Sequence, residues 1–205
     1  MHVDNEPKTH RLVVAITGAS GAPYAIRFLQ EAVKHYQEIY VALSDQAMQV
    51  ISLETGRTLN PRTLSAQTLI GIDTPVLKFA DKKDYFSPPA SGSYRHDGMV
   101  IVPCSMGTAG RIANGISDDL VTRAADVCLK ERRKLILVPR ETPWNLIHLR
   151  NMTQLAEAGA TILPASPGFY YKPATIDDLV AHLVARILQQ LGVEQTLVPE
   201  WQHEE

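Results

Sequence analysis

Residues 12–25 read Leu-Val-Val-Ala-Ile-Thr-Gly-Ala-Ser-Gly-Ala-Pro-Tyr-Ala, and this stretch predicts a buried strand, a glycine turn and the first turn of a helix. Gly18 and Gly21 let the backbone approach a ligand closely, and Ser20 adds a hydroxyl. The N-terminus of such a helix presents unpaired N–H groups, which attract anions. We therefore expect this turn to hold an anionic cofactor.

The turn lacks the fingerprint of dinucleotide-binding proteins. That fingerprint is G-x-G-x-x-G, whereas residues 18–21 provide only G-x-x-G. A mononucleotide is therefore favoured over NAD. A tight turn that binds no ligand is the alternative, because turns of this kind are common in α/β proteins.

Apolar runs alternate with segments of helical period along most of the chain. The predicted strands are 12–17, 39–44, 99–103, 135–139 and 161–163. The predicted helices are 23–34, 45–53, 63–70, 106–114, 119–132, 145–158 and 175–191. Continuous apolar strands are typical of parallel sheets that helices cover on both faces. The pattern predicts a single α/β domain with an open, doubly wound sheet, Rossmann-like or flavodoxin-like.

Length and composition limit the possible functions. The 205 residues suit one domain, which we place at 11–192, between a disordered extension, 1–10, and a tail, 193–205, that packs on the body or on a neighbouring subunit. A net charge of −2 gives no sign of the positive surface that binds nucleic acid or an anionic membrane. The apolar runs are far shorter than the roughly 20 residues that cross a bilayer. We expect no nucleic-acid partner and no membrane contact.

The cysteines and histidines predict neither a metal site nor a disulfide. No His, Cys, Asp or Glu set has the spacing of a zinc site, and Cys104 and Cys128 lie in apolar surroundings. Two buried, reduced thiols and the lack of a hydrophobic segment in residues 1–10 predict a cytoplasmic protein.

Ligands of doubly wound sheets bind at the carboxyl ends of the strands, so the residues after each strand are site candidates. Hydroxyls and glycines recur there: Gly18, Ser20, Gly21, Ser44, Ser105, Gly107 and Thr108. Together they favour a phosphate-binding rim, although each Ser or Thr alone is better explained as a helix cap. Residues 72–98 show no clear period, and within them Ser91-Gly-Ser is a candidate to close over a ligand.

Basic residues form a second group of candidates. Arg123 and Lys130 are two turns apart on one predicted helix, Arg140 and Glu141 follow a strand, and Arg186 lies in the last helix. Cations with one carboxylate suit a phosphate ester, because Arg and Lys bind the oxygens and the acid exchanges a proton. A solvated helix face and a weak surface ion pair are the alternatives.

Several motifs, in this order, resemble the flavin prenyltransferases of the UbiX type between about residues 11 and 191. They are Thr17-Gly-Ala-Ser-Gly-Ala, Ser52-Leu-Glu-Thr, Ser91-Gly-Ser, Pro103-Cys-Ser-Met-Gly-Thr, Leu120-Val-Thr-Arg-Ala-Ala-Asp-Val, Leu129-Lys-Glu-Arg-Arg, Val138-Pro-Arg-Glu-Thr-Pro, His148-Leu-Arg-Asn-Met and Pro167-Gly-Phe-Tyr. The resemblance implies a metal-independent transfer of a dimethylallyl group from dimethylallyl phosphate to N5 and C6 of reduced FMN. It also implies that a UbiD-type decarboxylase receives the prenylated FMN, and that the enzyme is a homo-oligomer, a dodecamer whose subunits share sites.

The resemblance also assigns roles to residues. The FMN contacts that it implies are Gly18, Ala19, Ser20, Ser44, Ser105, Met106, Gly107, Thr108 and Arg140. Those implied for dimethylallyl phosphate are Arg123, Lys130, Tyr170 and Arg186, with Glu141 completing the phosphate pocket. Ser20 and Glu54 would assist alkylation at flavin N5, so the implied catalytic residues are Ser20, Glu54, Lys130 and Glu141.

Two other functions remain open. A flavin-dependent cysteine decarboxylase would need an active-site histidine and a Pro-x-Met-Asn segment, whereas Pro143-Trp-Asn lacks the methionine. A non-catalytic FMN-binding subunit would need only the rim and would leave Arg123, Lys130, Glu141 and Arg186 without a role.

Overall fold

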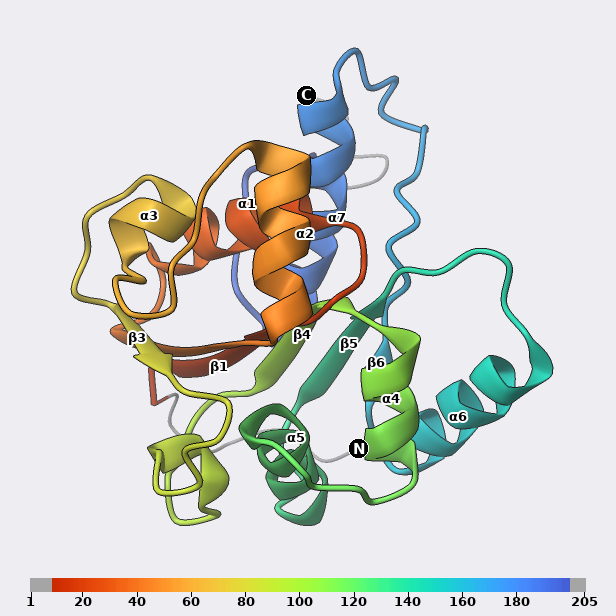
Figure 1. Ribbon diagram of the computed structural model, residues 1–205. Helices are drawn as coiled ribbons and strands as arrows, with labels where there is room; N and C mark the ends of the chain where they lie inside the picture. The colour runs from red at the N-terminus through yellow and green to blue at the C-terminus, as the bar shows by residue number, and fades with distance from the viewer. Residues whose placement is uncertain (1–8, 200–205) are drawn as a thin grey trace.

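The computed structural model describes residues 9–199, which form one domain around a six-stranded parallel sheet (Figure 1). The strands are β1 (Arg11–Ile16), β2 (Glu38–Leu43), β3 (Leu77–Ala80), β4 (Met99–Cys104), β5 (Leu135–Pro139) and β6 (Thr161–Ile162). Their order is β3-β2-β1-β4-β5-β6, and each neighbouring pair is parallel. This is the Rossmann order, so the Rossmann-like prediction is confirmed and the flavodoxin-like order is not found.

Helices cover both faces of the sheet, as the apolar strands predict (Figure 1). One layer holds α1 (Ala22–Ala32), α2 (Asp45–Thr55), α3 (Ala66–Ile70) and α7 (Ile176–Leu191). The other holds α4 (Met106–Ala113), α5 (Leu120–Lys130) and α6 (Leu146–Glu157). Strand β1 shows the reason: Leu12, Val14 and Ile16 face the first layer, whereas Val13 and Ala15 face the second.

The order reverses between β1 and β4, which are hydrogen-bonded neighbours. From β1 the chain winds outward through β2 to β3, and then returns to β4 and winds the other way. The loops that follow β1 and β4 therefore diverge to opposite faces and leave a crevice at the carboxyl ends. We call this edge of the sheet the rim.

The structure corrects the sequence interpretation in the segment 72–98. This segment contains the edge strand β3 and a short 3-10 helix, η1 (Pro88–Ala90). Four residues with an exposed Lys78 are too few to show a period. The third predicted helix also begins later than expected, at Ala66, because Ser65 and Thr68 form a capping box there. The other predicted helices and strands are found with shifts of one or two residues at their ends.

Both ends of the described chain contact the body. Thr9 and His10, which the sequence analysis assigned to an extension, hydrogen-bond the Asp97 carboxylate. Val193 and Leu197 of the predicted tail pack against the core beside α1 and α7. Residues 1–8 and 200–205, including Trp201, lie outside the described residues. Within 9–199, none of the helices has the length and apolar character needed to cross a bilayer.

Candidate cofactor and phosphate site

Thr17 joins the two loops that border the crevice at the rim. Its hydroxyl donates to the Pro103 carbonyl at 2.9 Å and accepts from the Ser105 N–H at 2.7 Å. The side chain is 2% exposed, so both hydrogen bonds are shielded from water. Thr17 thereby sets the turn after β1 against the turn after β4. The sequence motifs assigned no role to Thr17, although a Thr between an apolar strand and a glycine turn signals such a link.

The glycine turn after β1 is occupied by a carboxylate from the same chain. Glu54 on α2 accepts from the Gly21 N–H at 3.0 Å and from the Ala22 N–H at 2.7 Å. Negative charge at a helix N-terminus is stabilised by the helix dipole. The expectation that these N–H groups are unpaired is therefore wrong. Glu54 therefore lies at the turn that contains Ser20, the residue with which the resemblance groups it.

The two glycines of this turn are explained by the protein's own geometry. A Cβ at Gly18 would lie 2.5 Å from the Cβ of Gln46, so α2 packs directly on the turn. Gly21 has a φ of 126°, which side chains rarely adopt. Gly18 and Ser20 are exposed at the rim, whereas Ala19 is 6% exposed and belongs to the core.

The turn after β4 differs because its amides remain available. Ser105 caps α4 by accepting from the Thr108 N–H and donates its hydroxyl to Thr108 Oγ1 at 3.0 Å. Among the described residues, the N–H groups of Met106 and Gly107 have no hydrogen-bond acceptor. A Cβ at Gly107 would meet no protein atom within 4 Å, so a ligand can approach this backbone. The first turn of α4 therefore fits an anionic group.

The predicted side chains of this turn play structural roles. Met106 is 7% and Thr108 4% exposed, so both residues are buried. Ser44 likewise caps α2 by accepting from the Ala47 N–H. The helix-cap interpretation of the rim hydroxyls is thus confirmed for Ser44 and Ser105.

Arg140 spans the rim from the end of β5. Its backbone N–H donates to the Cys104 carbonyl, and its Nε donates to the Ser20 carbonyl at 3.3 Å. Arg140 thus lies across the end of β4 and meets the turn after β1. The predicted residues Ser20, Glu54 and Arg140, from three different elements, are therefore brought together at the crevice.

Glu141 is exposed next to Arg140 but does not pair with it. Its Oε1 accepts from the Thr142 N–H at 3.0 Å, and its carbonyl accepts from the Trp144 indole N–H at 2.9 Å. No ion pair joins Arg140 and Glu141 in the described part of the chain. The surface ion-pair interpretation is therefore wrong, and the Glu141 carboxylate faces solvent.

The cations of α5 form a separate group beside the segment that follows η1. Arg123 donates from Nε to the Ala90 carbonyl at 3.1 Å and pairs with Asp126 at 2.8 Å. Lys130 pairs with Glu131. A Cβ at Gly92 would lie 2.9 Å from the Lys130 ammonium nitrogen, so the Ser91-Gly-Ser motif lies directly against this cation.

This group lies away from the rim within one protomer. Lys130 ends α5, and β5 begins five residues later at Leu135, so Lys130 lies near the amino ends of the strands. The five residues of β5 separate the two edges by roughly 16 Å. One protomer therefore does not bring Lys130 to Ser20 and Glu54.

Arg186 lies on the other face of the sheet, in α7. It is exposed and donates to the Gln189 amide oxygen at 2.6 Å. Tyr170 is 76% exposed in the loop before α7. His182 of α7 contacts the loop that contains Tyr170, because its Nδ1 accepts from the Gly168 N–H at 3.3 Å and its ring contacts Tyr171. Burial and the nearby Arg186 lower the pKa of His182, which favours the neutral ring.

Both cysteines are free and buried, as the sequence predicts. Burial raises the pKa of each thiol to about 12, so neither is a thiolate near neutral pH. This argues against a cysteine nucleophile in the described part of the chain.

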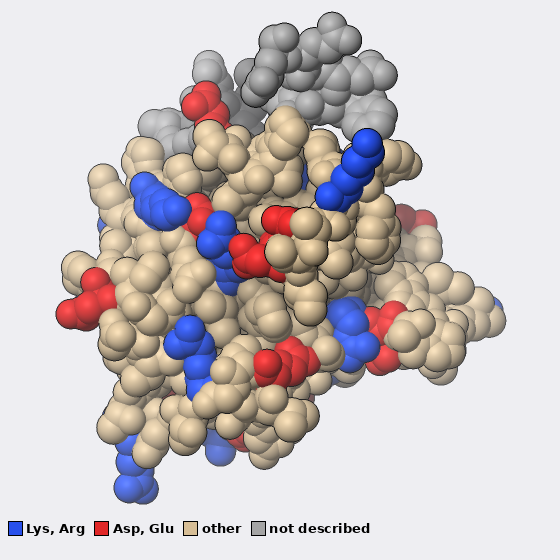
Figure 2. Space-filling view, turned by 90° about the horizontal axis from the view of Figure 1, so that it is seen from above, with Lys and Arg blue, Asp and Glu red and all other residues tan. Residues whose placement is uncertain are grey.

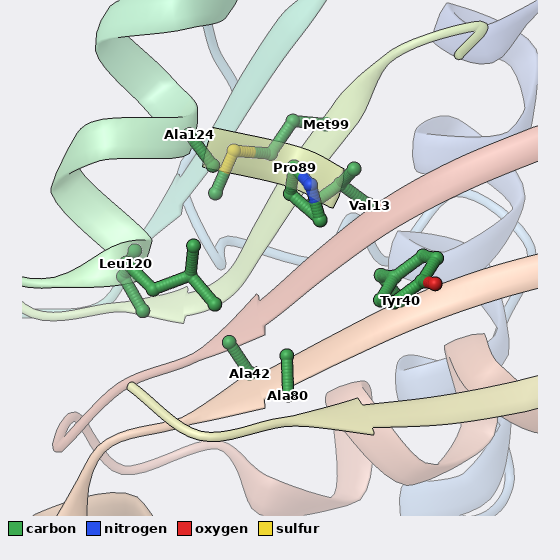
Figure 3. Close-up of a pocket in the computed structure, with 9 residues that line it drawn as sticks. Val13, Tyr40, Ala42, Ala80, Pro89, Met99, Leu120 and Ala124 are labelled. Atoms are coloured by element: carbon green, nitrogen blue, oxygen red, sulfur yellow. The ribbon is translucent and has the colours of Figure 1, made fainter. Parts of the chain in front are cut away.

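An apolar pocket lies between the sheet and the buried face of α5, and its lining residues Ala124 and Pro89 adjoin Arg123 and Ala90 (Figure 3). It is lined by Val13, Tyr40, Ala42, Ala80, Pro89, Met99, Leu120, Val121 and Ala124. No charged side chain borders it, so it does not suit a phosphate. Charges on the face seen in Figure 2 alternate in sign and do not gather into a basic patch.

Comparison with known proteins identifies the family to which this chain belongs. Residues 2–188 match the family model described as Flavoprotein. A flavin prenyltransferase UbiX from Alkalihalophilus pseudofirmus is 48% identical over 190 residues, which cover 93% of this chain and 95% of that protein.

Two solved structures are similar over nearly the whole chain. A dodecameric FMN-dependent UbiX-like decarboxylase from Escherichia coli O157:H7 is 41% identical with a TM-score of 0.84, covering 94% of this chain and 99% of that one. A UbiX protein, AnUbiX, in complex with FMN and dimethylallyl pyrophosphate is 40% identical with a TM-score of 0.84, covering 95% and 98%. The chain therefore belongs to the Flavoprotein family and, within it, to the flavin prenyltransferases of the UbiX type.

Proposed function

We propose that this protein is a flavin prenyltransferase that joins a dimethylallyl group from dimethylallyl phosphate to N5 and C6 of reduced FMN. The observation that carries the proposal is that Ser20, Glu54 and Arg140 lie together where the strand order of this UbiX-type chain reverses. Reduced FMN supplies the electron-rich ring that forms the new bonds. The residues bind it, orient it and handle the protons.

The rim fits FMN in its backbone and in its charges. The free N–H groups of Met106 and Gly107 suit an anionic oxygen, and Arg140 adds a guanidinium beside the same crevice. Glu54 is held at the start of α1 by two N–H groups, next to the exposed Ser20 hydroxyl. A carboxylate and a hydroxyl at this point can take up or return the proton of a flavin nitrogen.

The donor phosphate would be bound by Arg123, Lys130, Tyr170 and Arg186. Fixed positive charge stabilises a departing phosphate without a metal ion. Glu141 is exposed and near the rim, where it can exchange a proton with that phosphate. The related structure contains a pyrophosphate donor, so the test below compares both donors.

The assembly of this site would require more than one protomer. Lys130 lies near the amino ends of the strands and Arg186 on the opposite face, whereas Ser20 and Glu54 lie at the rim. We infer a homo-oligomer, a dodecamer as in the Escherichia coli relative, in which α5 of one copy faces the rim of another. We further propose that a UbiD-type decarboxylase in the cytoplasm receives the prenylated FMN.

The function is tested by mixing the anaerobic protein with reduced FMN and dimethylallyl phosphate or pyrophosphate, and measuring the mass of the released flavin. A flavin heavier by one dimethylallyl group is expected with at least one donor. Omission of the donor and the use of oxidised FMN are the controls. Unchanged FMN in every reaction would leave a non-catalytic FMN-binding subunit as the better interpretation. Oxidation of a cysteine-ending peptide would instead indicate the decarboxylase alternative.

Sharing of the site is tested by co-expressing two inactive variants, Glu54→Gln and Lys130→Met. If each site takes Glu54 from one copy and Lys130 from another, mixed oligomers contain some intact sites and regain part of the activity. A mixture as inactive as either variant alone would contradict the shared site.

A further inference from the structure

We propose that Arg133 is a positioning residue that holds the Ser91-Gly-Ser segment against Lys130 and so shapes the half of the site that binds the donor phosphate. The inference rests on the proposed function, because that function gives Lys130 its phosphate. Arg133 itself is not proposed to touch the phosphate or the flavin.

The contacts of Arg133 are two carbonyl groups on one segment. Its two terminal nitrogens donate to the Tyr94 carbonyl, at 2.7 Å, and to the Gly92 carbonyl. A planar guanidinium can make both contacts at once, because its donors form a fixed fork. Arg123 adds a third contact, to the Ala90 carbonyl at 3.1 Å. Two arginines from the α5 region therefore hold the backbone of residues 90–94.

The end of α5 fixes Arg133 in turn. Its backbone N–H donates to the Cys128 carbonyl at 2.8 Å, and Lys130 is the last residue of α5. The guanidinium is thus anchored three residues from Lys130, in the turn that joins α5 to β5. Because the same short stretch supplies the fork and the cation, the position of the segment relative to Lys130 depends on Arg133.

The segment is close enough to Lys130 for its position to matter. A Cβ on Gly92 would approach Lys130 Nζ to 2.9 Å and the Glu131 carboxyl carbon to 3.0 Å. Ser91 and Ser93, on either side, are exposed and share a hydrogen bond of 2.8 Å between their hydroxyls. A shift of this backbone would therefore move the surroundings of the ammonium group. The orientation of Lys130 towards a phosphate would change with it.

A lysine at position 133 would keep the charge but lose the fork, since one ammonium group cannot reproduce two parallel contacts. The neighbouring Arg132 provides a matched control. It is exposed and makes no side-chain hydrogen bond among the described residues. Arg132→Lys therefore makes the same chemical change one residue away without touching the segment.

The test compares the oligomeric wild type, Arg133→Lys and Arg132→Lys by the KM for dimethylallyl phosphate, kcat, and the Kd for FMN. For Arg133→Lys we expect the donor KM to rise about 10-fold, the size of one lost charge-assisted hydrogen bond, with a similar FMN Kd. Arg132→Lys should match the wild type. Equal donor KM values in the two variants would overturn the proposal. A parallel loss of FMN affinity in Arg133→Lys would also overturn it, because it would indicate a general structural role.

Binding of inorganic phosphate, measured by calorimetry without turnover, separates this inference from the proposed function. A wild type that binds phosphate but forms no prenylated flavin would refute the function. Weaker phosphate binding in Arg133→Lys alone would still support the positioning role. Equal phosphate affinity in both variants, or no phosphate binding by the wild type, would refute that role.

Discussion

The rim and the α5 surface are built in different ways, although both carry predicted site residues. At the rim, Thr17, Glu54 and Arg140 hydrogen-bond backbone groups of neighbouring loops, so one chain completes a network there. On α5, Arg123 bonds Asp126 of its own helix and the Ala90 carbonyl of η1, and Lys130 pairs with Glu131 just after the helix, as far as the described residues show. The contrast supports the proposal that one protomer would prepare the flavin side and that the donor side would depend on a neighbouring copy.

The largest expected effect comes from removing a cation of the α5 surface. Lys130→Met should lower kcat/KM. The expected loss of transition-state stabilisation is about 2–4 kcal/mol, by analogy with the loss of an oxyanion donor. FMN binding should be retained, because Lys130 lies away from the rim. Lys83→Met, an exposed lysine on another loop, is the control. Loss of FMN affinity in Lys130→Met would contradict the assignment of FMN to the rim and of the donor to the α5 surface.

Glu141 tests whether the rim also contributes to proton transfer. Glu141→Gln keeps the size of the side chain but removes the acid, so single-turnover prenyl transfer should slow about 100-fold. The Kd for FMN should stay close to that of the wild type, because among residues 9–199 the carboxylate hydrogen-bonds only the Thr142 N–H. An unchanged single-turnover rate would refute the assigned role.

Buried His96, which lies beside α5, makes the stability of the protein depend on pH. It is 6% exposed, stacks on Tyr94, and lies beside the Cys128 thiol. Its pKa is lowered to about 4, chiefly by burial and also by Arg133, whereas the Gly98 hydrogen bond and Asp97 oppose the shift. The unfolded chain, with an ordinary pKa near 6.5, binds more protons, so stability is complete above that pH and falls as the pH drops towards 4.

From pH 6.5 to pH 5, the free energy of unfolding should therefore fall by about 2 kcal/mol through His96 alone. Urea denaturation at several pH values, compared with His96→Gln, measures this contribution. The variant should be less stable at pH 7 and should lose less stability on acidification. Parallel pH dependences in the two proteins would show that His96 does not carry the effect.

Thr17 gives the smallest expected effect and tests the rim. Thr17→Val preserves the shape but leaves the buried Ser105 N–H without its acceptor, at a cost of about 1–2 kcal/mol. FMN affinity should fall, because the two loops at the crevice lose the side-chain hydrogen bonds between them and keep only the backbone bond from the residue 17 N–H to the Pro103 carbonyl, while the donor KM changes little. Thr17→Ser, which keeps the hydroxyl, is the control. Fluorescence titration of FMN measures the difference, and equal affinities for Val and Ser would argue against the link.

The sequence was informative where the signal is local. The apolar run before Gly18 gave the first strand, and Ser44, Ser105 and Asp119 mark helix starts as caps. Strand β3 was missed because four residues at a sheet edge leave no clear alternation. The family motifs named candidate site residues but could not tell which of them lie close together within one chain.

The sequence by itself determined the alternating strands and helices, the glycine turns and the inventory of charged groups, because periodicity and capping act between residues close in the chain. Only the tertiary structure decided that Glu54 fills the start of α1 from 33 residues away, and that Arg133 holds a segment preceding it by about 40 residues. Such contacts depend on how strands are ordered in the sheet. That order arises from packing among distant segments, which no local pattern records.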